Sequence, residues 1–95
     1  MPTGLSSLVL DAHRVRLSDL DLAAALLSLH RAQLVGHVSS DEPERQEFVL
    51  EGRRDQVTST TARYFLGDLL VEPRAFVAAR RLLERHLREK PPLPL

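Results

Sequence analysis

The last third of the chain, residues 61–89, contains two apolar stripes that repeat every three or four residues. The first stripe consists of Ala62, Phe65, Leu66, Leu69 and Leu70, and the second consists of Phe76, Val77, Ala79, Leu83 and Leu87. Such steps place side chains on one face of a helix. Pro73, between the stripes, suits the first turn of a new helix. Two helices joined so tightly are expected to pack antiparallel and to need a further apolar surface over their stripes.

The composition favours a single helical domain. The 95 residues are rich in Leu and Ala, and only three Phe and one Tyr are aromatic. Cysteine is absent, which excludes disulfides and thiolate metal sites. No apolar run reaches the roughly 18–20 residues of a membrane span, and residues 1–7 lack the pattern of a signal peptide. We expect a cytoplasmic, all-α bundle of about five antiparallel helices in residues 1–90, followed by a proline-rich tail in residues 91–95.

The first half of the chain supplies two further helical stripes. The first is formed by Leu5, Leu8, Val9, Ala12 and Val15, and the second by Leu22, Leu26, Leu27, His30 and Leu34. Ser18 stands three residues before Asp21, the pattern of a capping box, so a helix is expected to begin there. Gly36 is expected to end it. Leu26, Phe65, Leu69 and Phe76 are predicted to be core residues.

Residues 37–51 allow two interpretations. Ser39 or Ser40 can cap a short helix that includes Asp41, Glu42 and Pro43 in its first turn, and we favour this helix. Alternatively, the β-branched segments LVGHV (34–38) and EFVLE (47–51) can pair as a hairpin. Gly52 ends either element, and Asp55 can then cap the next helix. Because Thr58, Ser59, Thr60 and Thr61 are poor helix formers, that helix is expected to become regular only near Ala62.

Charge is unevenly distributed along a chain whose net charge is zero. Residues 1–51 contain eight acidic and four basic residues, whereas residues 52–95 contain five acidic and nine basic ones. The halves therefore carry −4 and +4. Opposite charges of this kind either are solvated helix faces or complement each other between molecules.

No set of residues resembles a complete active site, so we expect no enzyme activity and no cofactor. The four histidines lack the spacing of a metal site. Arg81 and His86 have the R-x4-H spacing of small helical toxin–antitoxin ribonucleases, which makes an RNA-cleaving enzyme one alternative. The basic excess of the second half leaves a nucleic-acid-binding helical module as another.

Five segments taken in order resemble a caspase-recruitment domain of the death-fold superfamily. These segments are AHRVRLSDL (12–20), LAAALLSLHRAQLVG (22–36), SSDEPERQEFVLEG (39–52), RRDQVTSTTARYFLGDLL (53–70) and EPRAFVAARRLLERHL (72–87). They are similar to the five helices that begin that family's fold, from the bent first helix to the fifth. The tail KPPLPL leaves no sequence for a sixth helix.

The resemblance implies a signalling adaptor, as in apoptosis and innate immunity, that assembles through complementary charged faces. Carried onto this chain, the basic face would contain Arg14, Arg53 and Arg54, and the acidic face would contain Asp19, Asp21, Asp41, Glu42 and Glu44. The expected partner is another death-fold domain or a second copy of the chain. A small-molecule substrate, nucleic acid or a membrane is not expected.

Overall fold

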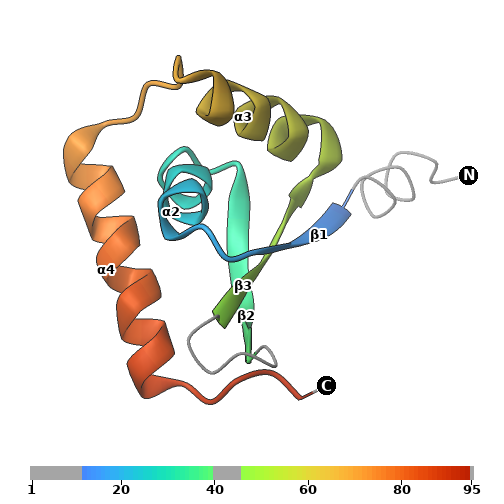
Figure 1. Ribbon diagram of the computed structural model, residues 1–95, viewed down its shortest axis with the longest axis vertical. Helices are drawn as coiled ribbons and strands as arrows, with labels where there is room; N and C mark the ends of the chain where they lie inside the picture. Colours follow the sequence, from blue (N-terminus) through green and yellow to red (C-terminus); the bar gives the residue numbers. More distant parts are fainter. Residues whose placement is uncertain (1–11, 40–45, 95) are drawn as a thin grey trace, which may run out of the picture.

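The computed structural model describes residues 12–39 and 46–94, which form a three-stranded antiparallel sheet and three helices. The prediction of an all-α bundle of five helices is therefore wrong. In chain order the elements are β1 (Ala12–Leu17), α2 (Leu20–Ser28), β2 (Ala32–Ser39), β3 (Gln46–Arg53), α3 (Arg54–Leu66) and α4 (Pro73–Glu89) (Figure 1).

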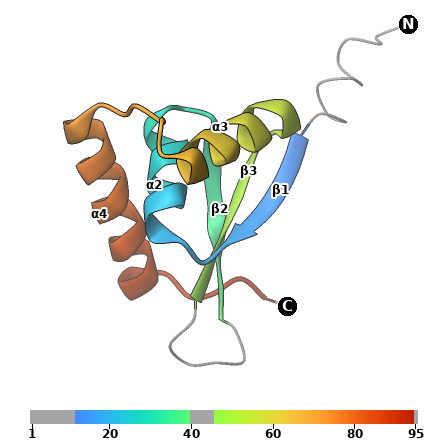
Figure 2. The ribbon, with the colours of Figure 1, turned by 45° about the horizontal axis from the view of Figure 1, so that its top comes forward.

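The sheet has the strand order β1-β3-β2, and β3 is antiparallel to both neighbours. Consequently β1 and β2 are parallel to each other, with β3 inserted between them. Parallel strands need a crossover connection, which α2 provides. Helix α2 packs on the sheet, and α4 packs along α2 on the far side (Figures 1 and 2).

Strand β1 replaces the first predicted helix over the described residues. Its side chains alternate: Val15 and Leu17 join the core, whereas Arg14 and Arg16 are exposed. A period of two is that of a strand with one buried face. Residues 5, 8 and 9 of the predicted stripe lie outside the described residues.

The pairing of the hairpin interpretation is confirmed, and the short helix that we favoured is wrong over residues 46–50, which form a strand. Its first turn, with Asp41, Glu42 and Pro43, lies outside the described residues. Leu34 pairs with Leu50, and His37 pairs with Phe48, so the two β-branched segments lie side by side in the sheet. A register shift between Leu34 and Gly36 marks a bulge. Gly36 lies inside β2 and does not end a helix.

Helix α2 begins close to the predicted start. Asp19, one residue after the expected Ser18, is the N-cap, and its carboxylate accepts the Leu22 N–H at 3.1 Å. The helix ends at Ser28, eight residues before Gly36. His30 follows with φ 56°, and this left-handed turn leads directly into β2.

Helices α3 and α4 are both present, but they do not pack against each other. Helix α3 is regular from Arg54, despite its run of Ser and Thr, and ends at Leu66, where Gly67 with φ 80° forms the C-cap. Pro73 is the first residue of α4, as predicted, and Glu72 caps that helix. The two helices diverge from their connection, and α4 packs against α2 (Figure 1). The predicted antiparallel pair of α3 and α4 is thus wrong.

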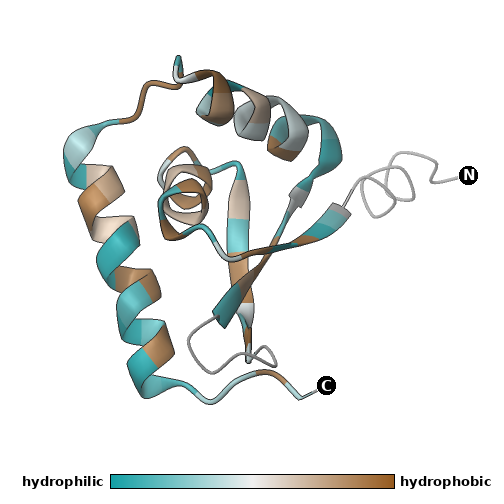
Figure 3. Cartoon of the chain, viewed as in Figure 1, coloured by the Kyte–Doolittle hydropathy of each residue, from teal (hydrophilic) through white to brown (hydrophobic). Residues whose placement is uncertain are grey.

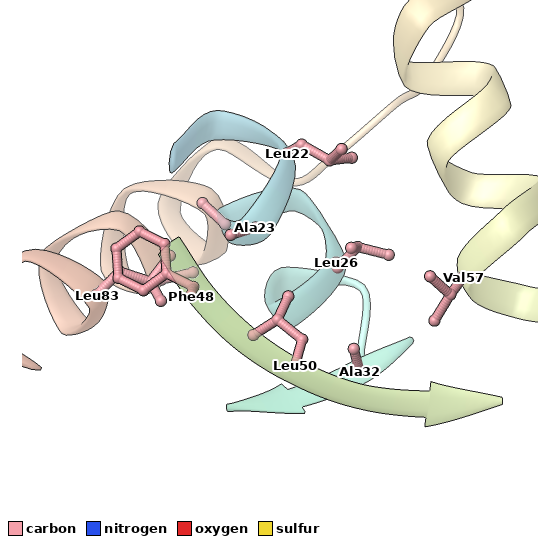
Figure 4. Close-up of a cluster of buried hydrophobic side chains, with 10 residues drawn as sticks. Leu22, Ala23, Leu26, Ala32, Phe48, Leu50, Val57 and Leu83 are labelled. Atoms are coloured by element: carbon pink, nitrogen blue, oxygen red, sulfur yellow. The ribbon is translucent and has the colours of Figure 1, made fainter. Parts of the chain in front are cut away.

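The core lies between the sheet, α2 and α4 (Figure 4). Its central residues are Leu22, Ala23, Leu26, Ala32, Phe48, Leu50, Val57 and Leu83. Leu26 is fully buried, as predicted. Phe76 and Leu69 are only half-buried. The placement of Phe65 in the core is wrong, since its side chain is 71% exposed.

The C-terminal residues 91–94 are not helical, as the prolines predicted, and they return to the edge of the sheet. The Leu93 N–H donates to the His37 carbonyl oxygen at 2.7 Å, and the Leu93 side chain lies over Gly36. Helices capable of crossing a bilayer, long and apolar throughout, are absent from residues 12–39 and 46–94.

Candidate interaction surface

An exposed apolar patch lies at the end of α3 and in the connection that follows. It consists of Phe65, Leu66 and Leu70, whose side chains are 71, 77 and 88% exposed. Figure 3 shows hydrophobic residues at this end of α3 and along the connection to α4. A cluster of large apolar side chains in solvent typically marks an interaction site.

The patch is exposed because α3 docks through a different face. Val57 and Thr60 are buried, and Tyr64 is half-buried against the core. These residues follow the steps of three and four that define one helix face. Phe65 lies beside that face and Leu66 lies nearly opposite it, and both are exposed. Sequence periodicity alone assigned the wrong stripe to the core, since α3 carries two competing stripes.

Tyr64 attaches α3 to the start of α2. Its hydroxyl donates to the Asp19 carboxylate, with distances of 3.1 and 3.0 Å to Oδ1 and Oδ2. The pKa of Tyr64 is raised, first by burial and then by this hydrogen bond and the charges of Asp19 and Asp21. The same carboxylate caps α2, so Asp19 is a structural residue that joins two helices.

Two opposite charges stand at the border of the patch. Arg63 Nε lies 3.9 Å from Asp68 Oδ1, and both side chains are about 60% exposed. Both residues also line a hollow of about 480 Å³ between α3, its following loop and the turn after α2. An exposed pair at this distance contributes at most a few tenths of a kcal/mol, so both charges are available to a partner.

The arginines of the predicted basic face lie on β1, at the end of the neighbouring strand β3 and at the start of α3. Arg14 donates to Glu51 across the sheet at 2.8 Å. Arg53 pairs with Asp55 at 3.3 Å, and Arg54 is exposed at the first turn of α3. Two of these three arginines thus form exposed ion pairs within the molecule.

Two residues of the predicted acidic face, Asp19 and Asp21, belong to the described part of the chain. Asp19 is held by Tyr64 and by the α2 cap, whereas Asp21 Oδ1 lies 3.3 Å from Arg80 Nε. Asp41, Glu42 and Glu44 lie outside the described residues. In the described part of the chain, the acidic residues of this face thus bind neighbouring elements of the same molecule.

The R-x4-H pair does not converge. Arg81 is exposed on the outer face of α4, whereas His86 is turned toward the sheet. Five residues amount to about 500° of helix rotation, which separates the two side chains by about 140°. The two side chains therefore leave α4 in different directions.

His86 instead meets a buried histidine of β2. The Nδ1 atoms of His37 and His86 are 2.9 Å apart, and the rings pack edge to face. The pKa of His86 is lowered, mainly by burial and then by the charges of His37 and Lys90. A group of three or more metal-ligating side chains is absent from residues 12–39 and 46–94.

Four arginines follow one line along the solvent side of α4. They are Arg74, Arg81, Arg85 and Arg88, and all four are exposed. Steps of seven, four and three residues keep them opposite Leu83, which is buried. We call this row the α4 arginine stripe. The basic excess of residues 52–95 was evident from the sequence, but its alignment on one face of α4 was not predicted.

Comparison of the chain with protein-family models, with curated proteins and with solved structures finds no match.

Proposed function

We propose that the chain is a non-catalytic interaction module that pairs with a second copy of itself through the apolar patch of Phe65, Leu66 and Leu70. The observation that carries this proposal is the exposure of all three side chains. Covering apolar surface contributes roughly 25 cal/mol per Å². Self-association through this patch keeps the homotypic interaction expected from the sequence and moves its interface away from Arg14, Arg53 and Arg54.

A second copy suits the charges around the patch. Arg63 stands two residues before Phe65, and Asp68 stands two residues after Leu66. A two-fold axis passing near Phe65 and Leu66 would bring Arg63 of each copy opposite Asp68 of the other. Such an isologous contact uses the same patch twice and closes as a dimer. The cytoplasm is the proposed location, since a chain without cysteine needs no oxidising compartment.

The Phe65→Gln, Leu66→Gln variant tests the patch. Sedimentation velocity over a range of protein concentrations should show a dimer for the wild type and a monomer for the variant. Because both side chains are already in solvent, the free energy of unfolding should change by only about 0.5 kcal/mol. The control is Leu82→Gln, an exposed leucine of α4, which should leave the dimer intact.

Charge reversal tests the two-fold arrangement. Arg63→Asp should weaken the dimer, because it places a carboxylate opposite Asp68 of the second copy. The double variant Arg63→Asp, Asp68→Arg should restore it. A wild type that stays monomeric at all concentrations would contradict the proposal. Dissociation by Arg53→Glu, Arg54→Glu with no effect of the Phe65 and Leu66 changes would favour the charged faces that the death-fold resemblance implies.

A further inference from the structure

We propose that the α4 arginine stripe is a binding surface for the phosphate backbone of duplex nucleic acid. This surface is separate from the apolar patch and does not depend on self-association, because it lies on a different helix. The described structure assigns the stripe no role in holding the fold together.

The +4 charge of the second half of the chain is localised entirely in this helix and the residue after it. Residues 73–90 contain six basic and two acidic residues, whereas residues 52–72 contain three of each. The positive charge is thus concentrated on one helix at the side of the molecule (Figure 1). A concentrated basic face on a neutral chain produces a local field that the net charge conceals.

The arginines of the stripe are free of carboxylate partners in the described part of the chain. Arg80, on the inner side of α4, pairs with Asp21 at 3.3 Å and with Glu84 at 3.9 Å. The ion pairs of residues 12–39 and 46–94 include none of the stripe residues. Like charges in one row repel each other, which favours a bound anion that offsets this repulsion.

The dimensions of the stripe fit a nucleic-acid strand. Fourteen residues separate Arg74 from Arg88, which corresponds to about 21 Å along a helix. One strand of a duplex carries about six phosphates over this length, at one per 3.4 Å of axis. Each guanidinium can donate two parallel hydrogen bonds to a phosphate.

Two other anionic partners fit the helix less well. Insertion into an anionic membrane surface needs an apolar helix face in contact with lipid, but Leu83 and Ala79 bury that face inside the molecule. An acidic protein surface usually adds a large buried apolar centre to its charge pairs, whereas the apolar side chains beside the arginine row are Val77, Ala78 and Leu82, and Val77 and Leu82 are 44 and 51% exposed. A uniform polyanion is the partner that the row matches best.

The position of the stripe also predicts how binding depends on the base sequence of the nucleic acid. Helix α4 packs along α2, so only its outer face is available to the nucleic acid. Contacts of this face go to phosphates, which position a protein without reading base sequence. Binding should therefore be strongly salt-dependent and similar for duplexes of different sequence.

Fluorescence anisotropy with a labelled 20-base-pair DNA duplex tests the proposal. With four phosphate contacts, log K should fall with log salt at a slope of about −3.6, so affinity should drop on the order of 100-fold from 50 to 200 mM salt. Arg81→Gln, Arg85→Gln should reduce the magnitude of the slope by about 1.8. Glutamine is a good helix former, so α4 should persist.

The matched control is Arg53→Gln, Arg54→Gln, which removes the same charge at the start of α3 and should leave the slope unchanged. Equal losses in the two double variants would overturn the proposal, since binding would then follow net charge alone. Absence of binding at 50 mM salt would overturn it too. Displacement of the duplex by polyglutamate at equal charge concentration would assign the stripe to acidic proteins and would equally overturn it.

Discussion

Gly52 and Gly36 each stand where a neighbouring group approaches the strand, but the neighbours differ in kind. A Cβ on Gly52 would collide with the carbonyl oxygen of Arg31 and would lie 3.1 Å from the Cα of Ala32. Those atoms belong to the backbone at the start of β2, so they cannot shift unless the strand shifts with them. A Cβ on Gly36 would lie 2.7 Å from Leu93, a side chain of the C-terminal segment. That segment is held by the hydrogen bond from Leu93 to His37.

Replacing the two glycines by alanine should therefore have different effects. Gly52→Ala is expected to lower the free energy of unfolding by about 1–3 kcal/mol, the usual cost of overpacking. Gly36→Ala should cost less, because Leu93 can move aside and alanine restricts the unfolded chain. Urea denaturation of both variants measures the difference. Equal losses of stability would indicate that the C-terminal segment is as firmly fixed as the backbone of β2.

At the scale of single elements, two adjacent leucines of α4 test how this helix is attached. Leu83 is fully buried in the core, whereas Leu82 is 51% exposed. Leu83→Ala should lower the free energy of unfolding by about 2–5 kcal/mol, because it leaves a cavity between α4, α2 and the sheet. Leu82→Ala should cost less than about 1 kcal/mol. Thermal or urea denaturation distinguishes the two, and a reversed order would mean that α4 presents its other face to α2.

The helices could be predicted where one stripe dominates. Helices α2 and α4 each have a single apolar face, and both were expected close to where they begin. Helix α3 was expected as well, but its core face was not. Its buried face includes Thr60 and Tyr64, which are less hydrophobic than Phe65 and Leu66. The Tyr64 side chain faces inward, where its hydroxyl donates to Asp19, and this contact is not evident from the sequence.

The strands were harder to predict because each is short. Residues 12–17 alternate with a period of two, but Ala12 and Val15 are also three residues apart and fit a helical stripe. The segment 47–51 has three apolar residues in a row, a pattern that fits a buried strand or a helix. In the structure this segment pairs with β2, as in the hairpin interpretation, and also with β1, 30 or more residues away, and no local signal predicts the pairing with β1.

The candidate surfaces could be predicted only in part. The sequence shows the residue types that form these surfaces, namely many arginines and many large apolar residues. Which charges are already paired is a property of the fold: Arg14 meets Glu51 only because β1 and β3 are neighbours. For this reason the ion pairs of Arg14, Asp21 and Arg53 could not be predicted from the sequence.

On the scale of the whole molecule, His37 and His86 connect strand β2, helix α4 and the C-terminal segment. His37 belongs to β2, and its carbonyl oxygen accepts the Leu93 N–H of the C-terminal segment. Its ring bonds His86 of α4. One Nδ1 must donate and the other must accept, so at least one ring has to stay neutral for this hydrogen bond to exist. Protonation of both rings removes the bond and places two positive charges together.

The direction of the pH dependence follows from the pKa of His86. Its pKa lies below the ordinary value of 6.5 in the folded chain, because of burial, His37 and Lys90. Below pH 6.5 the unfolded chain therefore binds a proton that the folded chain binds less readily. Binding of this proton stabilises the unfolded state, so the free energy of unfolding falls as the pH decreases through 6.5. Well above pH 6.5, this contribution to stability is fully retained.

His86→Gln should remove this dependence. The wild type is expected to lose more stability than the variant between pH 7.5 and pH 5, because only the wild type contains His86, whose pKa is lowered in the folded chain. Urea denaturation at both pH values gives the two differences, and their comparison cancels the titration of all other groups. The control is His30→Asn, an exposed histidine at φ 56°, where asparagine tolerates the backbone conformation. That variant should keep the dependence of the wild type. Identical pH dependences for the wild type and His86→Gln would mean that the contact between the two histidines does not link α4 to the sheet.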